Sequence, residues 1–186
     1  MKKVILTLSS MLVAIGAYAQ GTVNFSARVV GVYDAPVYVG SVGGTKAEGA
    51  AYLAQMYAGP TDNALAAIGT ALPFRTGTAA GYWTATALAI PTVAPGANAQ
   101  VQIKAWAAAS GATFEAASSA GGQIGQSAIF TVKTGGDGSP PSLPGTFPAT
   151  LTSFAISGGG GPVVPEPSIL ALGALGGLAL LLRRRK

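Results

Sequence analysis

The chain has 186 residues, no cysteine, no histidine and a formal net charge of +5 at pH 7. Six of its eleven basic residues stand near the two ends, and residues 20–164 carry five basic and five acidic side chains. This composition excludes disulfide bridges and catalytic sites built on histidine or cysteine, and the neutral body has no excess positive charge for binding nucleic acid.

Residues 1–19 have the three zones of a secretory signal peptide, in the usual order. Lys2 and Lys3 are positively charged, residues 4–16 are mostly apolar, and Ala17 and Ala19 supply the small residues that precede a cleavage site. We expect signal peptidase to cleave after Ala19 and the body of the chain to cross the membrane.

Alternation of apolar and polar side chains predicts strands along the body. Residues 100–106 (QVQIKAW) alternate most cleanly, and residues 22–30 (TVNFSARVV) and 128–133 (AIFTVK) show the same period of two. Further strands are expected in APVYVGSV, AYLAQMYAG, GYWTATALAI and LTSFAIS. Two short helices are expected, one running from a Thr61 cap through DNALAAI and one running through TFEAASSA with a cap near Thr113.

These elements predict a mainly β fold with one or two short helices. About seven short strands, separated by turns rich in Gly and Pro, are typical of a β-sandwich or jelly-roll-like domain. We place this single domain at residues 20–156, with a long breaker-rich loop at 134–148 and a Gly- and Pro-rich linker at 157–164.

No sequence pattern in the body is typical of an active site. Gly125 and Ser127 begin a nucleophile elbow, but Ile129 stands where the pattern requires glycine, so Ser127 is interpreted as a strand residue. The carboxylates are isolated from one another along the chain, so we expect no metal, no cofactor and no enzymatic activity.

A sugar-binding role remains an alternative. Tyr82 and Trp83 are candidate contacts for a sugar ring, and Trp83 is expected to be more exposed than Trp106, which the strand pattern places in the core. A carbohydrate-active enzyme would also need a pair of carboxylates across a cleft, for which Glu48 and Glu115 are candidates.

The last residues form a second sorting element. Pro165, Glu166 and Pro167 precede an apolar run at residues 168–182, and Arg183, Arg184, Arg185 and Lys186 end the chain. As a helix the run reaches about 22 Å, against about 30 Å for the hydrocarbon core of a bilayer. The basic cluster is expected to stay cytoplasmic, with the body on the other side of the membrane.

These three parts in this order resemble the PEP-CTERM sorting signal of exported bacterial proteins. The resemblance implies recognition by an exosortase, a membrane-embedded protease-transpeptidase that cleaves near Pro165–Pro167. It also implies an inner-membrane intermediate, with the body in the periplasm, followed by transfer to the cell envelope or release. The body itself resembles uncharacterised PEP-CTERM proteins of Verrucomicrobia-type bacteria.

The hypothesis that joins these observations is a non-enzymatic protein of the cell envelope or extracellular matrix, with a structural or adhesive role. Its expected partners are signal peptidase, an exosortase-type protease, the membrane through the C-terminal helix, and extracellular polysaccharide; nucleic acid is not among them. The alternatives are a carbohydrate-binding module or carbohydrate-active enzyme, and a permanently anchored membrane protein.

Mass spectrometry of the mature protein from its native host tests both sorting elements. We expect a mature form that begins at Gln20 and lacks Arg183–Lys186, because both ends are predicted to be cleaved during export. Recovery of the basic cluster on the mature, exported form would contradict C-terminal processing.

Overall fold

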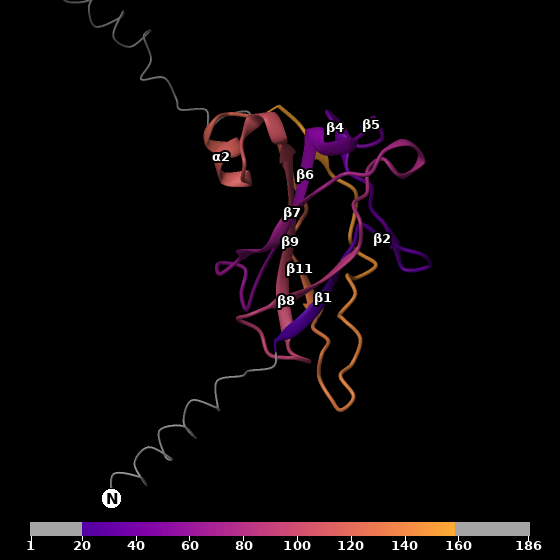
Figure 1. Cartoon of the computed structure of the whole chain (residues 1–186), viewed down its shortest axis with the longest axis vertical. Coiled ribbons are helices and arrows are strands. Elements are labelled where there is room, and N and C mark those ends of the chain that lie inside the picture. Colours follow the sequence, from indigo (N-terminus) through magenta and orange to yellow (C-terminus); the bar gives the residue numbers. More distant parts are fainter. Residues whose placement is uncertain (1–19, 159–186) are drawn as a thin grey trace, which may run out of the picture.

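The computed structural model describes residues 20–158, and Figure 1 shows these residues as stacked layers of strands with a short helix, α2 (Phe114–Ser119), at one end. The predicted signal peptide, most of the linker and the PEP-CTERM-like segment lie outside the described residues. Within residues 20–158, no helix is long and apolar enough to cross a membrane.

The larger layer is a five-stranded antiparallel sheet built around one long strand. Strand β9 (Asn98–Ala107) pairs with β6 (Tyr52–Gly59) along one edge and with two successive short strands along the other. The remaining strands of this sheet are β7 (Ala66–Pro73), which pairs with β6, and β10 (Ile124–Gln126) and β11 (Phe130–Lys133), which pair with β9.

The second layer consists of smaller sheets. Strand β1 (Gly21–Phe25) pairs antiparallel with β8 (Thr86–Ile90), and β2 (Arg28–Val29) forms a hairpin with β3 (Tyr33–Asp34). The third of these sheets joins β12 (Ala155–Ile156), β4 (Tyr38–Val39) and β5 (Thr45–Lys46), with β12 parallel to β4. Three single-turn 3-10 helices connect strands: η2 (Gly49–Ala51), η3 (Gly77–Ala79) and η4 (Ala108–Ser110).

The main core lies between the two layers. Met56 and Ile103 face one another across β6 and β9 on its sheet side, and Val23, Phe25 and Ile156 belong to the same buried cluster. Because apolar side chains from both layers are buried against one another, the expected mainly β fold is confirmed, and its arrangement is consistent with a β-sandwich.

A second, smaller core covers the other face of the large sheet. Trp106, which is fully buried, and Tyr57 point to this face and pack against Phe114 and Ala117 of α2. The predicted cap is confirmed, since the Thr113 side chain accepts a hydrogen bond from the Ala116 amide. The strand pattern correctly placed Trp106 in a core, although this core is the one beneath the helix.

The helix predicted to start at Thr61 is wrong. The Ala64 amide donates to the Thr61 carbonyl, which closes a turn, and the alanine-rich segment then continues as β7, with Ala66 opposite Ala58 and Ile68 opposite Met56. Alanine favours helix when it is considered locally, but here pairing with β6 and burial of Ile68 decide the conformation.

Ser127 lies in the interruption between β10 and β11, and its hydrogen bonds show its structural role. The Ser127 hydroxyl accepts a hydrogen bond from the Ile103 amide and donates to the Ala128 carbonyl, and the Gln102 side chain donates to the Ser127 carbonyl. These contacts satisfy the backbone of β9 where its partner strand is broken. Ser127 is therefore a buried structural residue, but it lies between two strands, so its interpretation as a strand residue is wrong.

Phe114→Ala is expected to lower the free energy of unfolding by about 3 kcal/mol, because it opens a cavity between α2 and Trp106. Urea unfolding of the purified full chain measures this loss. The exposed Ser119, at the end of the same helix, provides the control: Ser119→Ala is expected to change stability by no more than about 0.5 kcal/mol. Equal effects of the two substitutions would contradict the role assigned to the second core.

Candidate functional site

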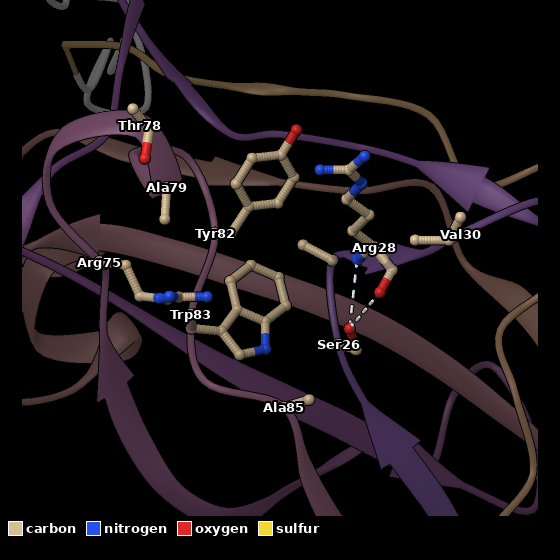
Figure 2. Close-up of a pocket in the computed structure, with 10 residues that line it drawn as sticks. Ser26, Arg28, Val30, Arg75, Thr78, Ala79, Tyr82, Trp83 and Ala85 are labelled. Atoms are coloured by element: carbon tan, nitrogen blue, oxygen red, sulfur yellow. Dashed lines mark hydrogen bonds between the residues drawn. The ribbon is translucent and has the colours of Figure 1, made fainter.

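A pocket of about 550 Å³ opens beside the β2–β3 hairpin. One wall comes from the chain between β1 and the hairpin tip, and the other comes from the loop that joins β7 to β8 (Figure 2). Its size lies within the range of about 300–1,000 Å³ that is typical of ligand sites. The lining residues are Ser26, Ala27, Arg28, Val30, Arg75, Thr78, Ala79, Tyr82, Trp83 and Ala85.

The β7–β8 loop is folded back on itself, and this places Tyr82 and Trp83 in the wall. Phe74 and Trp83 form an isolated antiparallel bridge, and the Arg75 amide donates to the Tyr82 carbonyl at 2.7 Å. Gly81 lets the loop approach the chain at residues 36–47: its φ is +89°, and a Cβ there would lie 2.9 Å from Pro36. Only glycine fits this position without strain.

Trp83 is buried rather than exposed, so the predicted exposure of this side chain is wrong. Its exposed fraction is 3%. The indole stacks on Phe25 with ring centroids 4.6 Å apart, meets Phe74 edge to face, and donates through Nε1 to the Phe25 carbonyl. The bridge to Phe74 draws the side chain into the main core, and one edge of the residue remains at the pocket wall.

Tyr82 is half-buried and lies in a small charged network. Its hydroxyl donates to Asp34 at 2.6 Å, and the other carboxylate oxygen of Asp34 lies 3.8 Å from Nε of Arg28. The Lys46 ammonium group lies 5.4 Å from the centre of the Tyr82 ring. Burial, together with the hydrogen bond and negative charge of Asp34, raises the pKa of Tyr82 to about 12.

Arg75 is the second cation of the pocket. Figure 2 shows the Arg75 and Arg28 side chains on opposite sides of Tyr82 and Trp83. Arg28 is paired with Asp34, whereas within residues 20–158 no acidic group lies within 4.0 Å of Arg75. The pocket therefore holds two guanidinium groups around an aromatic wall.

Glu115, one of the two candidate catalytic acids, is held in a contact between α2 and the sheet. It accepts a hydrogen bond from the Tyr57 hydroxyl at 2.8 Å, and the Lys104 ammonium group lies 4.0 Å away, over the rings of Tyr57 and Phe114. Burial alone would raise the pKa of Glu115, but the hydrogen bond from Tyr57 and the charge of Lys104 outweigh it and hold the pKa below its usual value.

The other acids of the body also have local partners. Glu48 accepts a hydrogen bond from the Gly77 amide at 2.9 Å, and Asp137 accepts one from the Ser142 hydroxyl. In the part of the chain that the structure describes, no three acidic side chains are close enough together to hold a metal ion.

The structure brings Tyr82 and Trp83 together with residues that the sequence did not single out. Arg28, Arg75, Val30 and Thr78 come from two segments almost fifty residues apart, and no local pattern marks them as neighbours. One feature of the sequence could have pointed to them: Arg28 and Arg75 are two of only five basic residues in a body that is poor in charge.

The other predicted site residues lie outside the described residues: Ala17 and Ala19, Pro165, Glu166 and Pro167, and the basic cluster Arg183–Lys186. Ala17 and Ala19 stay a prediction from the sequence pattern, whereas the C-terminal residues can be compared with a known family. Residues 163–186 match the family model of the PEP-CTERM protein-sorting motif.

The chain carries a PEP-CTERM sorting signal. This signal marks an exported protein that an exosortase processes in association with the membrane and directs to the cell envelope. No curated protein and no solved structure matches the chain. The match ends at the sorting signal, so the proposed resemblance of the body to other PEP-CTERM proteins stays a prediction.

Asp34→Asn is expected to lower the pKa of Tyr82 part of the way from about 12 toward 10.0, because it removes the negative charge that opposes the phenolate. The shift can be measured as the difference in ultraviolet phenolate absorbance between each protein and its Tyr82→Phe counterpart. Asp62→Asn, which removes the same charge from the β6–β7 turn, should leave this difference unchanged.

The raised pKa also sets a pH dependence of stability. Because Tyr82 ionises at a higher pH in the folded chain than its ordinary 10.0, its contribution is complete below pH 10 and is lost as the pH rises toward 12. Tyr82→Phe should therefore make the decline in stability between pH 10 and 12 shallower. An unchanged pH profile would contradict this assignment.

Proposed function

We propose that the mature body is a non-enzymatic structural or adhesive protein of the cell envelope or extracellular matrix. Signal peptidase releases it at Ala19, and the PEP-CTERM signal holds it briefly at the inner membrane before sorting. Two properties support a role outside the cell: the sorting signal at residues 163–186, and a body whose few charges balance. Surfaces with little net charge tend to associate with other surfaces.

The observation that carries the non-enzymatic part of this proposal is how the carboxylates are used. Four of the five acids of the body accept hydrogen bonds that hold local structure: Asp34, Glu48, Glu115 and Asp137. A glycosidase needs two carboxylates within about 10 Å that face a substrate across a cleft. Glu115 is instead used to fix a helix, and Glu48 to fix the loop at Gly77.

The sorting part is tested in the native host by replacing Pro165, Glu166 and Pro167 with alanine. The altered chain should accumulate uncleaved in the membrane fraction, because exosortase recognition is expected to require this motif, whereas the wild-type body should reach the envelope or the medium. Pro162→Ala, just before the matched segment, is the control and should be sorted normally. Normal processing of the triple variant would contradict the proposal.

The adhesive part is tested by deleting the gene and measuring attachment of cells and cohesion of their matrix. Both should fall, and both should be restored equally by the wild-type chain and by Glu48→Gln or Glu115→Gln, once melting curves show that the variants are folded. No loss of attachment or cohesion on deletion would contradict the adhesive role.

The alternative is a carbohydrate-binding module or a carbohydrate-active enzyme, favoured by the pocket that contains Tyr82 and Trp83. A glycan array and an assay of polysaccharide hydrolysis with the purified full chain separate these possibilities. Hydrolysis that disappears in Glu48→Gln or Glu115→Gln would replace the non-enzymatic proposal. Binding without hydrolysis would give the adhesive protein its ligand.

A further inference from the structure

Positive charge gathers around the pocket beside the β2–β3 hairpin. Three of the five basic residues of the described chain lie there, since Arg28 and Arg75 line the pocket and Lys46 packs on Tyr82. The acids in this region are already engaged, because Asp34 binds Tyr82 and Arg28 while Glu48 binds the Gly77 amide. The lining of the pocket itself includes two arginines and no acidic residue, so an anion that enters it meets cations first.

The two cations are both arginines, and this determines what kind of anion they suit. A guanidinium group presents five N–H donors in a planar fork that matches the oxygens of a carboxylate, sulfate or phosphate group. Nε of Arg28 lies 3.8 Å from Asp34, which is beyond hydrogen-bond distance. Arg75 has no acidic partner in the described residues.

The rest of the pocket wall is suited to a sugar ring rather than to a free inorganic anion. Val30 at the hairpin tip is 84% exposed, and with Tyr82 and the edge of Trp83 it provides apolar surface for the C–H face of a ring. Thr78, which lies on the same loop as Tyr82, is exposed and carries a hydroxyl group that can bond to a sugar hydroxyl.

We propose that this pocket binds an anionic sugar unit of an extracellular polysaccharide. Arg75 binds its carboxylate or sulfate group, Arg28 adds positive charge on the other side of the pocket, and Val30, Tyr82 and Trp83 contact the ring. The inference rests on the proposed adhesive function and gives it a ligand class and a site. Since the body has balanced charge overall, affinity comes from this local pair of arginines rather than from a general attraction to polyanions.

The mature protein, purified from its native host, is tested for binding to three immobilised polymers: polygalacturonate, dextran sulfate and unmodified dextran. Binding to one or both anionic polymers but not to dextran supports the proposal, and the preferred polymer identifies the carboxylate or the sulfate as the recognised group. Binding should weaken as salt is added, because exposed charges are screened. Absence of binding to both anionic polymers overturns the proposal.

Variants then decide whether the pocket is the site. Arg75→Gln should lower the affinity about tenfold or more, because it removes charge-assisted hydrogen bonds, and Arg75→Lys should give a smaller loss. Lys133→Gln removes the same charge from the exposed surface of β11 and should change the affinity less than about twofold. Equal losses in Arg75→Gln and Lys133→Gln would mean general charge attraction and would overturn the site.

Failure of the pocket assignment and failure of the proposed function give different results. If the polymers do not bind but deletion of the gene still weakens attachment, the adhesive role stands and the pocket assignment is lost. If the polymers bind through Arg75 and deletion has no effect on attachment, the pocket assignment stands and the adhesive role is lost.

Discussion

Strand β9 is hydrogen-bonded along both of its edges, and the rest of the described structure depends on that pairing. Its register with β6 sets Met56 opposite Ile103 on one face, toward the main core, and Leu53 opposite Trp106 on the other. A strand that is buried on both faces cannot slip by one residue, because a slip would exchange the two sets of side chains. The positions of the second layer and of helix α2 both follow from this register.

The pocket is a consequence of how the second layer is anchored to that core. Trp83 fixes the β7–β8 loop by stacking on Phe25, which is itself fully buried. Arg28 follows Phe25 by three residues, and Arg75 is joined to Tyr82 by a backbone hydrogen bond. The same aromatic contact therefore stabilises the sandwich and holds the two arginines on either side of one cavity. Burial of Trp83, which the sequence did not predict, is what positions this wall of the pocket.

Local sequence patterns were sufficient to predict the elements whose side chains are buried at regular intervals. The alternation at residues 100–106 and 128–133 predicted β9 and β11, and the Thr113 cap predicted α2. They failed where a partner outside the segment decides its conformation. The segment after Thr61 became a strand because β6 offered it a partner, and Trp83 became buried because Phe25 and Phe74 met it. The pocket joins segments that only the folded chain brings together, so composition could not reveal it.

The basic residues fall into two groups, one in the predicted sorting segments at the two ends and one in the body. Four of the basic residues form the C-terminal cluster and two lie in the predicted signal peptide, so removal of both ends leaves a body with five positive and five negative side chains. Such a body exerts little long-range attraction on a polyanion, and the screening length at physiological salt is only about 8 Å. Any selectivity for an acidic polymer must then come from groups at contact distance. In the described structure, the pair of arginines beside Tyr82 supplies such groups. We propose that the apolar wall next to them favours an anion attached to a ring.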